Sequence, residues 1–284
     1  MLLIKVYNNR IENFNQLSSK IFSKKIGFLI DGIITFSLYT GFSVMVAGSG
    51  AIFKEQLGLS FNIGIIVMII CCFIVFLFSL EGLSFISSIL VPLLVIGIVF
   101  TSYYISKGEG YDFSLIEGVK LTSKGNFITS ALLYFGANAL LIIVVFSSLL
   151  PIIDSKKTAI LGGLVGGIIL YFLAISILNP MLIFYDKVHN LDMPMLQISS
   201  FVGEGYRKIY AAILWIAIFT TALANGFGFV NKFPSKSKMK AIIILCVSAI
   251  PLAKFGFANL VGIIYPIFGF AGVIIMGLVL IKIS

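Results

Sequence analysis

The residues of this sequence that could do chemistry are polar side chains placed inside long apolar segments. In one such segment Tyr39, Ser43, Ala47 and Gly50 are spaced three or four residues apart. Residues at this spacing lie on one face of a helix, so the pattern predicts a small, hydroxyl-bearing face. Two interpretations fit it: close packing against another helix, or one wall of a substrate cavity in which Tyr39 and Ser43 contact the solute.

A second apolar segment is interrupted by Tyr134 and Asn138, which flank Gly136. We expect the helix to break at Gly136, because unwound backbone groups at the middle of the bilayer are a common means by which transporters hold substrate and ion. These three residues are therefore predicted to contact the substrate. The alternative is an unbroken helix in which Asn138 forms a hydrogen bond to a neighbouring helix.

A third segment contains Thr220, Thr221 and Asn225, of which Thr221 and Asn225 share one helical face. Hydroxyl and amide oxygens suit a hard monovalent cation, so these three residues are the candidate ion-binding site. The alternative is that the threonine hydroxyls donate to carbonyl groups of their own helix, as they often do in membrane helices.

Catalysis finds little support in the sequence. The single histidine, His189, lies in a connecting segment, and no Ser/His pair or carboxylate pair lies within an apolar run. Cys71, Cys72 and Cys246 all lie inside apolar runs at spacings that suit neither a disulfide framework nor a metal site. We therefore predict no enzyme, no catalytic or metal site, and no cofactor other than a sodium ion for coupling.

The elements that position these groups must be membrane helices. The chain has 284 residues, of which 60% are hydrophobic and 11% charged, with a mean hydropathy of +1.13. This composition excludes a large soluble domain. We predict an all-α, polytopic transmembrane helix bundle, residues 27–284, that follows a basic cytoplasmic segment, residues 1–26. The predicted spans are 27–50, 63–80, 83–106, 127–150, 159–178, 210–230, 241–253 and 260–281.

Charge predicts the orientation of the bundle. With eight spans, the loops on the N-terminal side carry 12 of the 20 Lys and Arg residues, and the opposite loops carry 8. Positive residues favour the cytoplasmic side, so we expect a multi-pass protein of the cell membrane with both termini in the cytoplasm. The net charge of +9 has the same explanation, and no nucleic acid is expected as a partner.

The order of these features resembles the YkvI-type family of bacterial membrane proteins, which are similar to amino-acid permeases of the amino acid–polyamine–organocation superfamily. The resemblance covers nearly the whole chain. It is carried by short, glycine-rich motifs: 24–28, 43–51, 55–59, 132–134 with Asn138, 220–222, and 225–228.

The resemblance implies a leucine-transporter-like fold with two inverted five-helix repeats, in which the eight spans are helices three to ten. The family's broken sixth helix falls on Tyr134, Gly136 and Asn138, its cation-binding hydroxyl pair on Thr220 and Thr221, and its third-helix wall on Tyr39 and Ser43. Its first two helices, including one with a glycine-rich break, have no counterpart before Lys24. We therefore expect a truncated chain that lacks part of the binding site.

These observations together predict a secondary transporter of a small amino-acid-like solute in the bacterial inner (plasma) membrane. The expected transport is coupled to sodium or to no ion, and sodium is the better candidate ion because related proton-coupled members place a lysine in the helix at 83–106 and this chain has none there. The alternative is a non-transporting scaffold or partner subunit. The expected partners are the lipid bilayer, the solute, and either a second copy of the chain or a chain that supplies the missing helices.

Overall fold

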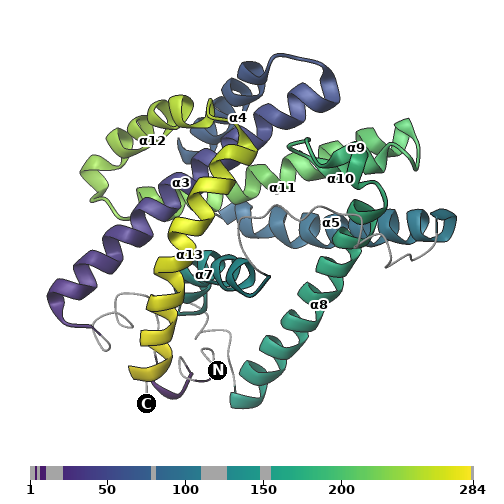
Figure 1. The fold of residues 1–284 in the computed structure, drawn as a ribbon. Helices are drawn as coiled ribbons and strands as arrows, with labels where there is room; N and C mark the ends of the chain where they lie inside the picture. The colour runs from purple at the N-terminus through teal and green to yellow at the C-terminus, as the bar shows by residue number, and fades with distance from the viewer. Residues whose placement is uncertain are drawn as a thin grey trace. The chain divides into compact units, whose positions relative to one another are not determined.

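The structure is a computed structural model that describes residues 4, 7–10, 22–77, 81–109, 127–147 and 155–282. For residues 81–91, 109, 141, 144–147 and 282 it describes the backbone alone. All of the elements in these ranges are helices (Figure 1). They are α3 (Lys24–Leu57), α4 (Phe61–Leu77), α5 (Glu81–Glu109), α7 (Phe127–Ser147), α8 (Lys156–Ile183), α9 (Tyr185–Val188), α10 (Pro194–Ser199), α11 (Glu204–Val230), the 3₁₀ turn η2 (Ser235–Ser237), α12 (Lys238–Ala253) and α13 (Phe257–Lys282).

The all-α class is confirmed for the described residues, and each of the eight predicted apolar ranges contains one helix. The predicted residues 78–80 and 148–150, and most of the segment 1–26, lie outside the described residues. Four helices, α3, α8, α11 and α13, are long and apolar enough to cross a membrane. That all eight helices cross the bilayer stays a prediction.

The chain divides into two compact units. Unit 1 comprises Met1–Ser37, Thr122–Leu170 and Gly262–Ser284, and unit 2 comprises Leu38–Leu121 and Tyr171–Val261. Helices α3, α8 and α13 each contribute to both units. Each unit is described below by its own contacts.

Unit 2 is built on an antiparallel pair of helices, α3 and α11. Successive contacts run in opposite directions along the two helices: Leu38 lies against Gly228, Gly41 against Asn225, Gly48 against Ile218, Ser49 against Trp215, and Glu55 against Arg207. Gly41, Gly48 and Ser49 of α3 are small residues that let the second helix approach closely. The pair therefore stays in contact from Leu38 to the last turn of α3.

Helix α4 completes the core of this pair. Phe76 of α4 stacks edge-on with Phe227 of α11 at a ring separation of 4.9 Å and lies 6.0 Å from the ring of Phe42 of α3. Aromatic rings prefer such edge and tilted arrangements. Gly64 of α4 allows the close approach to α3, because a Cβ there would lie 2.6 Å from the carbonyl oxygen of Ser49.

Helix α5 packs on the other part of α11. The hydroxyl of Tyr206 donates to the carbonyl of Gly97 at 2.9 Å and forms a second hydrogen bond of 2.9 Å with Thr101. The far end of α5 is joined to α8, where the Asn179 amide donates to Ser106 at 2.6 Å. Polar contacts between helices thus replace part of the hydrophobic driving force that a bilayer does not supply.

Unit 1 contains close contacts between α7 and α13. A Cβ built on Gly136 would collide with the carbonyl oxygen of Gly269, and one on Gly272 would collide with the carbonyl of Gly136. The first part of α3 also packs on α13, with the rings of Phe36 and Phe268 5.9 Å apart. Glycine on both helices is required wherever two backbones approach this closely.

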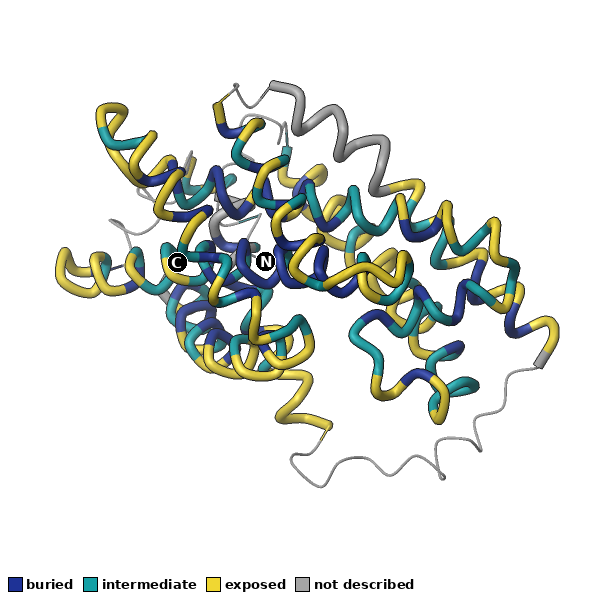
Figure 2. The backbone as a smooth tube through the Cα atoms, turned by 90° about the horizontal axis from the view of Figure 1, so that it is seen from above, coloured by how far each residue is buried: buried dark blue, intermediate teal, exposed yellow. Residues whose placement is uncertain are grey.

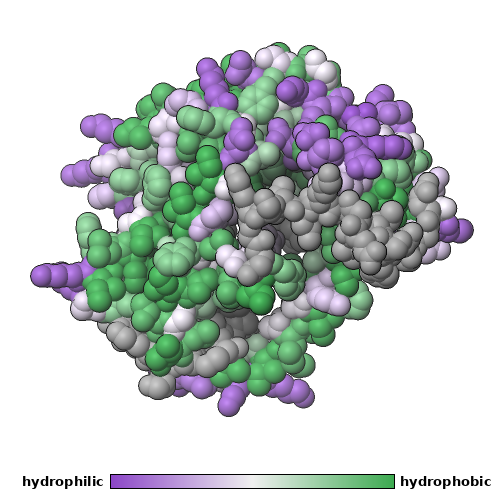
Figure 3. Space-filling view, viewed as in Figure 1, coloured by the Kyte–Doolittle hydropathy of each residue, from purple (hydrophilic) through white to green (hydrophobic). Residues whose placement is uncertain are grey.

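The surface is rich in large hydrophobic side chains. Phe28 is 80% exposed, Phe127 85% and Leu164 59%, and exposed residues recur along the helices in Figure 2. Figure 3 shows hydrophobic residues over much of one face, with hydrophilic residues gathered around α9 and α10. Exposed apolar area of this extent is unusual for a protein in water and is expected for one covered by lipid.

Candidate functional site

The predicted residues of α3, Tyr39 and Ser43, make hydrogen bonds within unit 2. The Tyr39 hydroxyl donates to the backbone carbonyl of Ser248 on α12 at 3.1 Å, and its ring lies 6.0 Å from that of Phe229. Ser43 is fully buried, and its hydroxyl donates to the carbonyl of Tyr39 at 3.0 Å. Both side chains therefore contribute to helix packing in the described structure.

The predicted helix break at Gly136 is wrong, because α7 is continuous through residues 134–138. The Asn138 amide donates to the carbonyl of Tyr134, one turn back in the same helix, at 2.8 Å. This bond lies within α7, so it is not the hydrogen bond to a neighbouring helix that the alternative predicted. Gly136 instead serves the contact with α13, and Tyr134 is 66% exposed.

The candidate ion-binding residues lie on α11, and their donor groups turn back to their own helix. The hydroxyls of Thr220 and Thr221 both donate to the carbonyl of Ala217, at 3.0 and 2.9 Å. The Asn225 amide donates to the carbonyl of Thr221 at 3.1 Å. The alternative prediction of back-bonding is therefore confirmed, although three oxygen atoms, two of them hydroxyl, still gather around Ala217.

Asn225 is the candidate residue that lies at the contact between α3 and α11. Its side chain is 6% exposed and lies against Gly41, where a Cβ would be 3.1 Å from the Asn225 Oδ1 atom. The five candidates of α3 and α11 belong to unit 2, and Tyr134, Gly136 and Asn138 belong to unit 1. Among the candidates of unit 2, Asn225 therefore forms a buried polar contact with Gly41 between α11 and α3.

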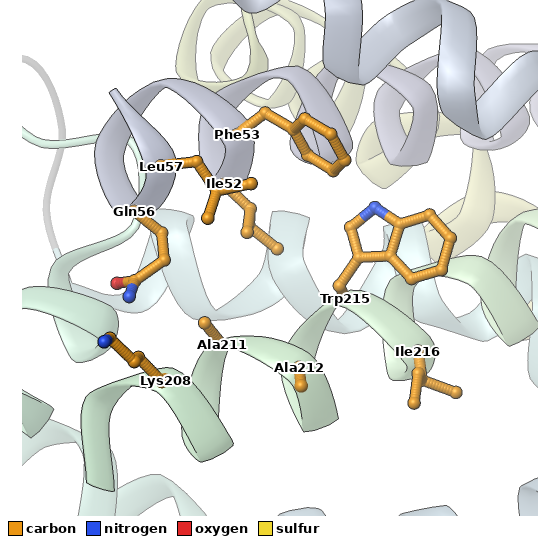
Figure 4. Close-up of a pocket in the computed structure, with 9 residues that line it drawn as sticks. All are labelled: Ile52, Phe53, Gln56, Leu57, Lys208, Ala211, Ala212, Trp215 and Ile216. Atoms are coloured by element: carbon orange, nitrogen blue, oxygen red, sulfur yellow. The ribbon is translucent and has the colours of Figure 1, made fainter. Parts of the chain in front are cut away.

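A pocket of about 390 Å³ lies between the end of α3 and the beginning of α11. Figure 4 shows Gln56 and Lys208 at one end of it and Trp215 and Ile216 toward the other. The remaining lining residues are apolar: Ile52, Phe53, Leu57, Ala211 and Ala212. Its volume falls within the range of small-molecule sites, and its lining has the usual composition, mostly apolar with a few polar groups.

The sequence alone does not reveal this pocket, because its two walls are about 150 residues apart in the chain. Two signals were available: Lys208 directly precedes an apolar run, and Trp215 is the one tryptophan of the sequence. Tryptophan and lysine both favour the boundary between lipid and water. Only the packing of α3 on α11 brings them to one site.

The polar end of the pocket contains an acceptor that lacks a partner. The Oε1 atom of Gln56 is buried and has no hydrogen-bond partner among the described residues. The Nε atom of Arg207, one residue before Lys208, is also buried and forms no hydrogen bond in the described part of the chain. Such groups are rare in folded proteins because they lose their hydration without compensation, and each requires an explanation such as local strain or a bound water or ion.

A hydrogen-bonded junction lies beside the pocket. The carboxylate of Glu55 accepts from the backbone N–H of Asp192 at 2.9 Å, and Arg207 donates to the Glu55 carbonyl at 2.9 Å. Asp192 in turn accepts from the N–H of Ala258, in the first turn of α13, at 3.1 Å. The charged residues here join α3, α11 and the segment before α10, so their first role is structural.

The described residues contain no candidate metal-binding cluster. No cluster of three or more His, Cys, Asp or Glu side chains occurs within the part of the chain that the structure covers. His189 stacks on Tyr185 at a ring separation of 5.2 Å and lies 3.1 Å from the Tyr185 carbonyl. This contact has the geometry of a local helix-end interaction.

Comparison with known proteins identifies two relatives, while no protein-family model matches the chain. The chain is 28% identical over 284 aligned residues to the uncharacterized membrane protein YkvI of Bacillus subtilis (strain 168), covering 95% of this chain and 78% of YkvI. It is 24% identical over 249 residues to the uncharacterized protein YyaD of the same organism, covering 85% of this chain and 70% of YyaD. The similarity to YkvI, together with the long apolar helices, makes this chain a membrane protein.

Proposed function

We propose that the protein is a secondary transporter, a permease-like carrier of a small amino-acid-like solute that is coupled to sodium. One observation carries the proposal: Asn225 is buried against Gly41 where two long apolar helices meet. On α3, the charged residues nearest to Gly41 are Asp31 and Lys54, so the contact lies far from either end of the apolar run. Polar side chains at this depth are costly in lipid and are typical of substrate and ion pathways.

Sodium is the proposed coupling ion, and Thr220 and Thr221 are its proposed ligands. Their hydroxyl groups donate to one carbonyl, that of Ala217, which leaves their own lone pairs to accept. Oxygen donors of this kind suit a hard monovalent cation. Thr220 is buried and Thr221 is exposed, so the ion would approach from the Thr221 side.

The proposal extends to fold and orientation. The eight helices are taken as helices three to ten of a leucine-transporter-like fold, a reading supported by the resemblance in sequence. The excess of Lys and Arg on the N-terminal side supports cytoplasmic termini in a bacterial inner membrane. Tyr39 and Ser43 are the proposed substrate contacts of unit 2, and Tyr134, Gly136 and Asn138 are those of unit 1, with Gly136 acting within a continuous helix.

Uptake into proteoliposomes tests this function. Vesicles that contain the purified protein should accumulate a labelled apolar or small amino acid when sodium is high outside, and not with potassium in its place. Thr221→Ala should raise the sodium concentration for half-maximal uptake about tenfold, since a polar contact with a charge contributes about 1.5 kcal/mol. Thr221→Ser keeps the hydroxyl and should match the native protein. Absence of uptake by folded protein would favour the scaffold or partner-subunit role.

A further inference from the structure

We propose that the pocket between α3 and α11 binds one phospholipid with an anionic head group. The order of residues along the pocket supports this assignment. Lys208 and Gln56 lie at one end, and Trp215, Ile216 and Ile52 lie further along the same two helices. The pocket therefore changes from polar to apolar along its length.

This change follows the direction of the two helices. From Lys208 to Ile216 the chain of α11 rises by about 12 Å, at about 1.5 Å per residue. Helix α3 is antiparallel, so the step from Gln56 back to Ile52 runs in the same direction. Charged residues at the helix ends mark the head-group region and the apolar residues mark the hydrocarbon region. A phospholipid has the same order of polarity along the bilayer normal.

The polar end suits an anionic head group that also carries a hydrogen-bond donor. Lys208 is exposed and forms no ion pair with any residue that the structure describes, so its ammonium group is available to a phosphate. The Gln56 side chain lines the same end of the pocket and adds a neutral amide to it. A glycerol head group supplies both a phosphate and donor hydroxyls. Basic sites between membrane helices bind anionic lipids in this way.

The apolar end favours a lipid over a soluble amino acid. Seven of the nine lining residues are apolar, which suits an acyl chain along the whole wall. A small zwitterion would occupy the polar end and leave most of that wall uncovered. Ala212 is exposed, so the chain can continue from the pocket into the bilayer.

Fluorescence of Trp215 reports directly on this pocket, because the sequence contains one tryptophan. The full-length protein is reconstituted in phosphatidylcholine vesicles with small fractions of either brominated-chain phosphatidylglycerol or brominated-chain phosphatidylcholine. Bromine quenches tryptophan on contact. We expect half-maximal quenching at about a fivefold lower fraction of the brominated phosphatidylglycerol, the preference that one surface lysine provides at about 1 kcal/mol.

Matched variants separate the pocket from general attraction to the surface. Lys208→Gln should remove the fivefold preference, whereas Lys54→Gln removes the same charge in the last turn of α3, outside the pocket, and should keep most of it. Ala212→Phe fills the pocket without disturbing a buried residue and should reduce quenching by either lipid.

Two results would overturn the proposal. One is equal quenching by the two brominated lipids in the native protein. The other is relief of quenching by a free amino acid at concentrations that leave the lipid unchanged, which would assign the pocket to a soluble solute.

Discussion

The indole N–H of Trp215 donates a 2.8 Å hydrogen bond to the hydroxyl of Ser49, and that hydroxyl donates to the carbonyl of Gly64 at 2.8 Å. One buried serine therefore joins α11, α3 and α4. The same indole forms part of the pocket wall. The position of Trp215 in the pocket depends on this chain of bonds.

Replacing Ser49 with alanine should leave the Trp215 N–H without its partner and should remove the link to the Gly64 carbonyl, which keeps only its bond within α4. The cost of such an unsatisfied buried group is about 1–3 kcal/mol. Unfolding in mixed detergent micelles, followed by circular dichroism, should show this loss. Ser248→Ala is the matched control, because Ser248 is partly exposed and its hydroxyl donates to the Ile244 carbonyl of its own helix, so its change should be within about 0.5 kcal/mol. Equal losses in the two variants would contradict the assignment.

A second prediction concerns Gly136. Alanine at this position should destabilise the protein by about 1–3 kcal/mol, because its Cβ would collide with the backbone of Gly269 and one helix must move. Gly162→Ala is the control, since a Cβ there meets nothing within 4 Å and alanine is the better helix former. Melting temperatures of the two variants in one detergent test the difference. A Gly136→Ala protein as stable as Gly162→Ala would refute the close contact.

The helices of this protein are largely predictable from sequence, and their ends are less so. A long apolar run with few charges favours a helix, and each of the eight predicted ranges contains one in the described part of the chain. Helix α3 continues to Leu57, past the predicted end at Gly50, and Arg207 donates to the carbonyl of Glu55 in its last turn. That partner lies about 150 residues away, so a local pattern cannot indicate it.

The candidate site is less predictable from the sequence than the helices are. Gly136 was predicted to break its helix because glycine is permissive, whereas its function in the structure is to let α7 approach α13. Glycine has both roles, and the sequence around it does not distinguish them. The back-bonding of Thr220 and Thr221 was predictable, because a hydroxyl in an apolar helix has few other acceptors. The pocket was not predictable, because it forms only where α3 packs on α11.

A third prediction concerns Asp192, which accepts the N–H of Ala258 in the first turn of α13. These first N–H groups have no partner inside the helix, and a carboxylate there also interacts favourably with the helix dipole. Asp192→Ala should increase hydrogen exchange across residues 256–262 and cost about 1 kcal/mol of stability. Asp192→Asn retains an acceptor and should recover most of the protection. Unchanged exchange in both variants would argue against this cap.

A fourth prediction separates function from stability at the contact of Gly41 with Asn225. In Gly41→Ala the new Cβ would lie 3.1 Å from Oδ1 of Asn225, so the amide must shift by a few tenths of an ångström. We expect solute uptake to fall severalfold while stability changes by less than about 1 kcal/mol, because alanine's helix propensity offsets the crowding. Gly32→Ala, on the same helix with nothing within 4 Å, is the control. Normal uptake by Gly41→Ala would show that Asn225 does not contribute to transport.

The most direct test of the proposed function is thermal stabilisation of the purified protein by candidate solutes. A ligand that binds only the folded state raises its apparent stability, by about 2.7 kcal/mol at a hundredfold excess over the dissociation constant. Melting is measured across a panel of amino acids, each with sodium and with potassium. The proposed function predicts a rise for one class of amino acid in sodium and a smaller rise in potassium. No rise for any amino acid in a monodisperse sample would contradict it.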